Sequence, residues 1–478
     1  MKNTIKLLAI LTLAATLGSC SKSFIDKDKP YSMTEKVIFS NPTYIESALL
    51  GCYDSFKSTN PSFMGGLAYI VFDCRGEDIV NISNPVTMQD TYEMKVLGTS
   101  QENDRIWDYA YRTINTCNLF IDNLEKYGCA ELLGEKVYKQ YVAEAKFLRA
   151  YCYYVLANLY SQPYSLNPKA VCVPLRLTGL TTPGNNNCPA STIEQVYAQI
   201  LTDCVPADLA SAPATEAGVT RASAAAAHML KMRIYMAEEK WDEAITEGTS
   251  ITGYELAEDV TALYGKDTYK NKEMIFALPM STQPGDTPNT QMSCAEYFSK
   301  AANVSWLNTE SGILSEADYS LAADARISKL VSDEDSNGYV YSMKFTDKAQ
   351  KLDWIPVMRY AETLLNLAEC YTHKADGAAK AKAALKQVRG RSIPTGDTID
   401  VDALSGGNLT TAVLKERRLE FICEGIRGVD IIRRGENFVK KFGKSINLNV
   451  APDATNYVWP IPDREKDFNA TLDGNKDE

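Results

Sequence analysis

Basic, acidic and apolar residues alternate in one stretch of the chain, Leu414–Glu436, with the sequence LKERRLEFICEGIRGVDIIRRGE. Charged side chains in such numbers could perform acid–base catalysis or form ion pairs with one another. Arginines interleaved with Leu, Ile and Phe are not typical of a solvated helix, and the planar guanidinium group suits a half-buried ion pair. We therefore interpret the stretch as a structural ion network, to which we assign six residues: Glu416, Arg417, Arg418, Glu420, Glu424 and Arg427.

Three glutamates of this stretch recur at every fourth position. If a helix begins at Leu414, then Glu416, Glu420 and Glu424 share one of its faces. Gly425 and the glycine three residues later are expected to end that helix. Paired carboxylates could serve as general acid and base, but no nucleophile or metal ligand accompanies them. A structural role is therefore favoured over a catalytic one.

Other motifs for catalysis are missing from the sequence. It contains only two histidines, His228 and His373, and no GxSxG motif, CxxC pair or glycine-rich phosphate loop. We therefore expect no enzyme activity, no metal site and no cofactor. The formal net charge of −11 argues against a nucleic-acid partner.

The first thirty residues have the pattern of an export signal and an anchor. A basic start is followed by the apolar run Leu7–Leu17, which is too short to span a membrane, and then by Gly18-Ser19-Cys20. Small residues before a cysteine are typical of a lipobox. We expect residues 1–19 to be a signal peptide, Cys20 to carry lipid, and residues 20–30 to tether the fold to the membrane.

Helical periodicity dominates the rest of the chain. Apolar residues recur every 3.6 positions from Trp107 to Leu124 and again over Glu135–Tyr160. Ser191 and Glu194 have the spacing of a capping box at the start of the next helix. The sequence predicts a mainly α fold of tetratricopeptide-like helical hairpins, with about eight helices, over 31–478. The hairpins are expected at about 105–250 and 354–436.

Two segments lack this periodicity, Ser58–Ser100 and an insertion at about 254–353. Both are rich in turn-forming residues, although Met274–Leu278 resembles a strand. An irregular insertion of this length in a helical scaffold is where a ligand is usually bound. We expect the two segments to form one ligand-binding face.

A sugar presents apolar faces edged by hydroxyl groups, so aromatic rings and polar side chains suit it. Trp306 is the only tryptophan outside a motif of the scaffold, and a role in pinning the insertion to the core explains it equally well. For Arg75, an internal ion pair with Asp73 or Asp78 is the favoured alternative. The candidate ligand-binding residues are these: Asp73, Arg75, Asp78, Tyr92, Tyr297, Phe298, Trp306 and Tyr319.

Five motifs follow one another along the chain in an order that resembles the SusD/RagB family of outer-membrane nutrient-binding lipoproteins of the Bacteroidetes. They are the lipobox at Cys20, EAKFLRA at Glu144–Ala150, RYAETLLNLAE at Arg359–Glu369, the stretch Leu414–Glu436, and WPIPDRE at Trp459–Glu465. One departure is Cys423, which stands where the family usually has Phe.

The resemblance implies a lipid-anchored protein on the cell surface, at the outer face of the outer membrane. It also implies a SusC-like TonB-dependent outer-membrane transporter as partner, to which the lipoprotein delivers an oligosaccharide or, in some members, a peptide. Ligand contacts vary within the family, so none is transferred to this chain. Three hypotheses stay open: a glycan-binding subunit, a peptide-binding subunit, and a helical-repeat envelope adaptor without a small ligand. The many tyrosines slightly favour glycan.

Overall fold

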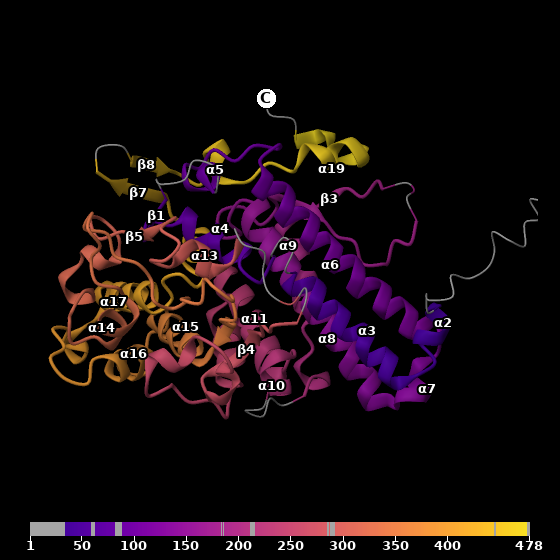
Figure 1. Cartoon of the computed structure of the whole chain (residues 1–478), viewed down its shortest axis with the longest axis horizontal. Helices are drawn as coiled ribbons and strands as arrows, with labels where there is room; N and C mark the ends of the chain where they lie inside the picture. Colours follow the sequence, from indigo (N-terminus) through magenta and orange to yellow (C-terminus); the bar gives the residue numbers. More distant parts are fainter. Residues whose placement is uncertain are drawn as a thin grey trace, which may run out of the picture.

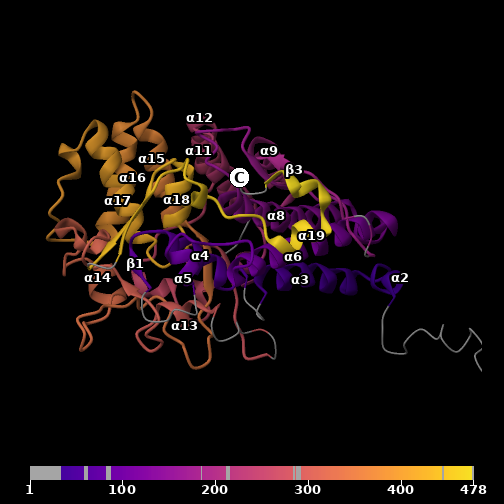
Figure 2. The ribbon, with the colours of Figure 1, turned by 90° about the horizontal axis from the view of Figure 1, so that it is seen from above.

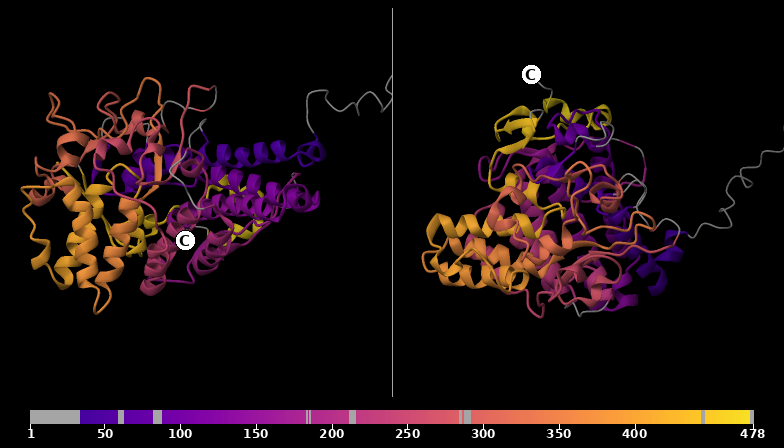
Figure 3. Two further views of the ribbon diagram at one scale, coloured as in Figure 1. Left: turned by 90° about the horizontal axis from the view of Figure 1, so that it is seen from below. Right: turned by 60° about the vertical axis from the view of Figure 1, so that its left-hand side comes forward.

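The computed structural model describes residues 34–58, 63–81, 88–182, 184, 186–210, 216–283, 286, 292–443 and 446–475. The predicted signal peptide (1–19), Cys20 and the tether (20–30) lie outside these residues. Within them the predicted mainly α fold of helical hairpins is confirmed, and short two-stranded sheets lie between the helices (Figure 1). The indigo-to-purple helices and the orange helices occupy opposite sides of the molecule in the left view of Figure 3.

Two helices of 26 residues each, α6 (Gln101–Lys126) and α8 (Glu135–Tyr160), form the central hairpin of the first half. Helices α3 (Pro42–Lys57) and α9 (Ile193–Asp203) pack against this hairpin. The predicted start of α9 is wrong by one residue. Thr192 accepts a hydrogen bond from the backbone N–H of Gln195, whose side chain accepts one in return, so these two residues form the capping box.

In the second half, α11 (Ala224–Ala237) packs on α12 (Trp241–Thr249), and α12 packs on α15 (Tyr360–Thr372). Helix α15 also packs on α16 (Ala378–Ser392) and α17 (Gly406–Glu420), which stand side by side in Figure 2. The segment at about 354–436, predicted to consist of helical hairpins, does not begin with a helix. Its first part is the strand β6 (Ile355–Arg359), because this segment pairs with β4 (Met274–Leu278), the strand expected in the insertion.

The end of α17 also differs from the prediction. The helix stops at Glu420, and the chain then turns through Cys423 and Gly425, whose φ angles are +64° and +70°. Glu424 therefore lies in this turn and not on the helix face of the other glutamates. The second glycine, Gly428, lies inside a further helix, α18 (Arg427–Arg433), where a Cβ atom would lie 2.3 Å from the carbonyl oxygen of Phe72.

The segment 58–100 is less irregular than expected, because it contains the buried helix α4 (Leu67–Arg75). The strand β1 (Ile79–Val80) follows this helix and pairs with β5 (Trp306–Leu307) of the insertion. The pairing aligns Val80 with Trp306. The two segments predicted to form one face are thus joined by a two-stranded sheet.

The remaining helices and strands are short. They are α2 (Glu35–Ile38), α5 (Gln89–Tyr92), α7 (Cys129–Leu133), β2 (Val171–Pro174), β3 (Ala190–Thr192), α10 (Glu216–Thr220), α13 (Cys294–Phe298), α14 (Ala325–Leu330), β7 (Phe438–Phe442), β8 (Ile446–Val450) and α19 (Asp463–Phe468). In the part of the chain that the structure describes, no helix is both long and apolar enough to cross a membrane.

Candidate ligand-binding face and the ion pairs behind it

Glu420, the last residue of α17, is the centre of a buried ion network. Its carboxylate accepts hydrogen bonds from Arg359 at 2.5 Å, Arg326 at 2.9 Å and Arg391 at 2.7 Å. These arginines come from β6, α14 and α16, so one carboxylate holds the insertion against two elements of the helical scaffold. The network continues through the following residues: Glu273, Asp324, Lys344, Arg389, Asp397, Glu416 and Glu424.

A second network begins at Arg417, three residues before Glu420 in α17. Arg417 donates to Asp430 of α18 at 2.7 Å, and Asp430 also accepts from Arg433 at 2.9 Å. Arg433 in turn pairs with Glu369 of α15 at 2.6 Å. Because Arg417 also lies 3.5 Å from Glu362, both α17 and α18 are tied to α15.

Two further arginines of this stretch hold β1. Arg418 donates to Asp78 at 2.6 Å and lies 3.0 Å from Glu77, and Arg427 donates to Glu77 at 2.7 Å. The other contact of Asp78 is the backbone N–H of Ile313 in the insertion, at 2.7 Å. All six residues assigned to the network from the sequence therefore form ion pairs in the structure, and they fasten both irregular segments to the helices.

The arginines keep these buried carboxylates ionised. Burial alone would raise the pKa of Glu420, but Arg391, Arg359 and Arg326 lower it well below its usual value. Burial also raises the pKa of Asp430, but the charges of Arg417 and Arg433 outweigh this effect and lower that pKa to about 2. The pKa values of Glu420 and Asp430 are lower in the folded chain than in the unfolded chain. The stability that these two carboxylates contribute is therefore fully present at a pH above their unfolded pKa values, and it is lost as the pH falls toward 2.

An aromatic cluster lies where β5 meets the hairpin β7–β8. The rings of Trp306 and Tyr339 stack with their centroids 4.1 Å apart and an interplanar angle of 12°. Phe442 of β7 meets Trp306 edge-on at 6.0 Å. Trp306 is buried, whereas Tyr339 and Phe442 are half-buried and present part of their rings at the surface. We call Trp306, Tyr339 and Phe442 the aromatic cluster.

Polar groups fix the loop that carries Tyr339. Asp335 accepts hydrogen bonds from the backbone N–H groups of Asn337 and Tyr339, at 2.8 and 3.0 Å, and from the hydroxyl of Tyr341 at 2.8 Å. The same hydroxyl lies 2.7 Å from Oδ1 of Asn303. On the other side, Asn308 donates to the carbonyl of Lys441 in β7 at 3.1 Å. The half-buried rings are therefore held in place before any ligand arrives.

The four candidate residues of the first segment are all buried. Asp73 accepts from the backbone N–H of Gly425 at 2.8 Å, and Asp78 is held by Arg418. The carbonyl oxygen of Tyr92 accepts a hydrogen bond from Lys440 at 2.5 Å. Arg75 pairs with neither aspartate, so the internal ion pair that we favoured is wrong. Its guanidinium donates to backbone carbonyls and lies 4.4 Å from the ring centre of Phe438.

The four candidates of the insertion are buried too. The hydroxyl of Tyr297 lies 2.7 Å from the sulfur of Cys74, and Phe298 packs edge-on against the Tyr297 ring. Tyr319 lies under the guanidinium of Arg389. Of all eight candidates, Trp306 alone belongs to the aromatic cluster, and a ligand would meet the other two rings of that cluster first. For these eight residues direct ligand contact stays a prediction.

Tyr339 and Phe442 were missed by the sequence analysis. The turn signal Ser336-Asn337-Gly338 marks the loop before Tyr339. Phe442 belongs to a hairpin whose position beside the insertion depends on long-range contacts and leaves no local signal.

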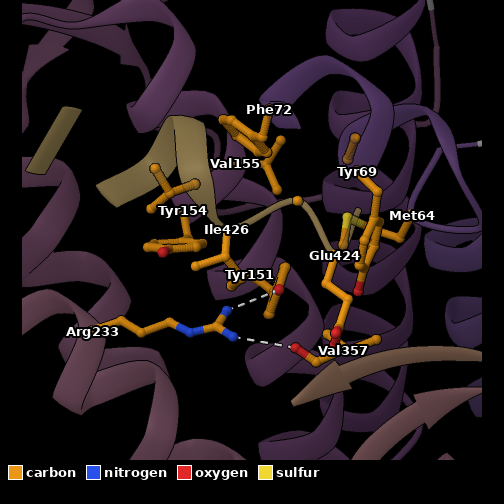
Figure 4. Close-up of a pocket in the computed structure, with 13 residues that line it drawn as sticks. Met64, Tyr69, Phe72, Tyr151, Tyr154, Val155, Arg233, Val357, Glu424 and Ile426 are labelled. Carbon is orange, nitrogen blue, oxygen red and sulfur yellow. Dashed lines mark hydrogen bonds between the residues drawn. The ribbon is translucent and has the colours of Figure 1, made fainter. Parts of the chain in front are cut away.

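One interior void can be excluded as a ligand site. It lies between α4, α8 and the turn after α17, and its volume of about 20 Å³ holds roughly one water molecule. Figure 4 shows Arg233 at its edge, donating to the hydroxyl of Tyr151 at 3.0 Å and to the carbonyl of Val357 at 3.2 Å. Its lining is the packed core of the scaffold.

Comparisons with known proteins agree with this geometry. Two family models match the chain, one described as the SusD family over residues 325–476 and one described as "Starch-binding associating with outer membrane" over residues 23–236. A SusD superfamily protein of Bacteroides fragilis with a crystal structure is 50% identical, with 92% of this chain and 100% of that chain covered and a TM-score of 0.86.

Two more distant proteins are also similar to this chain. Surface glycan-binding protein A of Bacteroides fluxus is 20% identical over 90% of this chain and 97% of its own, with a TM-score of 0.68, which shows a common fold. SusD-like protein P25 of Formosa agariphila is 24% identical over 294 residues, which are 57% of this chain. That match spans 52% of the relative, about half of its length.

The helical hairpins, the insertion and the ion-paired turn define a tetratricopeptide-like scaffold that presents an irregular face. Since the B. fragilis relative is matched over its whole length at 50% identity, the family is established. The chain belongs to the SusD family.

Proposed function

We propose that the chain is a cell-surface lipoprotein that binds an oligosaccharide and delivers it to a SusC-like TonB-dependent outer-membrane transporter. The observation that carries the proposal is the aromatic cluster at the junction of the two irregular segments. Its half-buried rings provide an apolar surface on which a sugar ring can stack. The amide and carboxylate groups of the neighbouring loops can form hydrogen bonds with the hydroxyl groups of the sugar.

The family supports the ligand class and the location. One matching model is described as "Starch-binding associating with outer membrane", and a relative of the same fold is named a surface glycan-binding protein. The lipobox supports an anchor at Cys20, which would keep the face close to a transporter in the same membrane. The protein acts by binding, without catalysis of its own.

Calorimetric titration of the mature chain with a panel of oligosaccharides tests the proposal. Binding of at least one glycan is expected, with modest affinity, because ring stacking tolerates small differences in linkage. If no glycan binds while a peptide does, the sugar proposal is wrong and the peptide-binding role replaces it.

A further inference from the structure

A second groove lies away from the aromatic cluster, along the outer side of α6. It consists of two hollows of about 210 Å³ each, which share Asn186 and Glu465 as lining residues. Joined, they have a volume within the range of roughly 300–1,000 Å³ that is typical of small-ligand sites. Helix α19 covers one end of the groove and lies beside α6 in both Figure 1 and Figure 2, apart from β1.

The floor and the lip of the first hollow are aromatic. Trp107 of α6 lines the hollow and is buried, and the ring of Tyr111, which lines the second hollow, lies 4.8 Å from it. The indole N–H of Trp107 has no acceptor within the described residues. At the lip, Phe468 is 66% exposed, which is the largest exposure among the large apolar side chains described.

Two of the charged side chains that line this hollow take no part in the ion pairs of the fold. These are Asp104 and Arg464, whose opposite charges attract each other, although neither side chain makes a hydrogen bond or a close ion pair within the described chain. Arg464 is exposed, and Asp104 is half-buried. In contrast, Arg176 and Glu465 at the junction of the two hollows face each other at 3.5 Å.

These groups together match one kind of ligand. A free carboxylate accepts hydrogen bonds, a free guanidinium donates them, and an exposed ring covers an apolar face. A pyranose ring needs all three, because its hydroxyl groups both donate and accept while its carbon face is apolar. The volume of the first hollow limits the ligand to about one such ring.

We propose that the groove between α6 and α19 is a second saccharide site that binds a single sugar residue through Asp104, Arg464 and Phe468. Its ligand class rests on the proposed function, but its residues are different from those of the aromatic cluster. The site also gives a role to the Arg464-Glu465 pair that ends the WPIPDRE motif.

Saturation-transfer NMR of the mature chain with glucose, galactose, mannose and N-acetylglucosamine tests the inference. At least one sugar is expected to give a signal, and Arg464→Ala and Asp104→Asn are each expected to weaken its binding by at least tenfold. Phe468→Ala should do the same. The melting temperature should change little, because none of the three side chains makes a hydrogen bond or a close ion pair within the described chain.

Two control variants separate this site from the rest of the molecule. Lys139→Ala removes an exposed charge on α8, and Tyr339→Ala alters the aromatic cluster. Both should change sugar binding at the groove by less than twofold. If Tyr339→Ala removes the signal while Arg464→Ala leaves it unchanged, the groove inference is overturned and the proposed function stands. A wild-type chain that binds oligosaccharides but gives no signal with any single sugar overturns it as well.

Discussion

At the scale of single residues, Arg359 and Glu420 show how charges are kept inside a protein. Arg359 is one of the most deeply buried side chains, and its guanidinium contacts three carboxylates, those of Glu273, Glu420 and Glu424. Taking these charges out of water costs free energy that only close, multiple pairing recovers. The network therefore specifies which elements meet, because any other arrangement leaves a buried charge unpaired.

Arg418 gives the clearest test at this scale. Its replacement by alanine leaves Asp78 buried with a backbone N–H as its other contact, so we expect a loss of stability of roughly 3–5 kcal/mol. Arg112→Ala is the matched control, because it breaks an exposed pair with Asp108 and should change stability by about 0.5 kcal/mol or less. Thermal unfolding measures both. Unchanged melting of Arg418→Ala with loss of glycan binding would show instead that Arg418 is a ligand contact.

Residue types predicted the network but not its geometry. Arginine among apolar residues indicated buried ion pairs, and all six assigned residues form them. The partners of Arg418 and Arg427 could not be predicted, because Asp78 and Glu77 lie in an irregular segment 340 and 350 residues away in the sequence. The eight candidate ligand residues were chosen by type within those segments, and type alone does not distinguish a buried tyrosine from one at the surface.

At the scale of elements, the turn after α17 joins both ion networks. Gly425 has a φ of +70°, and a Cβ atom there would lie 2.8 Å from the Cα atom of Tyr69 in α4. A residue with a side chain would strain the backbone and push α4 away from the turn. The close approach of α4 therefore depends on this glycine.

Gly425→Ala is expected to destabilise the fold by more than about 1 kcal/mol, because the left-handed conformation and the contact with Tyr69 both oppose a side chain. Gly407→Ala is the control. It lies in α17 with open space around it, so alanine should stabilise that helix by roughly 0.5–1 kcal/mol. Denaturant unfolding compares the two. Equal changes in the free energy of unfolding for the two variants would contradict the strain that we assign to Gly425.

Helix periodicity predicted the elements well where the chain is locally regular, as in Glu135–Tyr160, whose bounds match α8. It failed where tertiary pairing decides the local structure. The segment at β6 lies at the start of the stretch 354–436 that we assigned to helical hairpins, yet it pairs with β4 as a strand. The turn at Cys423 was missed because a non-glycine residue with positive φ has no reliable sequence signal.

At the scale of the whole molecule, the ion-paired turn explains why two irregular segments form one face. Arg418 and Arg427 hold β1, and the network around Glu420 holds the insertion that contains β5. The strand pairing of β1 with β5 then places the aromatic cluster beside the β7–β8 hairpin. The helical scaffold therefore holds the candidate ligand-binding face in place through ion pairs, and the face presents the rings of the aromatic cluster.

The predicted lipid anchor at Cys20 can be tested separately. Cys20→Ala should remove the acceptor of the lipid, so the protein is expected to leave the membrane fraction. Labelling with a fatty acid measures this directly, with the Cys423→Ala chain as a control that keeps Cys20. A mature wild-type protein that takes up no label would contradict the prediction.

The central claim is that the aromatic cluster binds the glycan. Trp306→Ala is a poor test, because Trp306 is buried and its removal would leave a cavity that costs roughly 3–5 kcal/mol. Calorimetric titration of Tyr339→Ala with the best oligosaccharide of the panel is more direct, because this half-buried ring can be removed with less damage. We predict at least tenfold weaker binding with little change in melting, and no change for the exposed control Tyr44→Ala on α3. Full affinity in Tyr339→Ala would contradict the account.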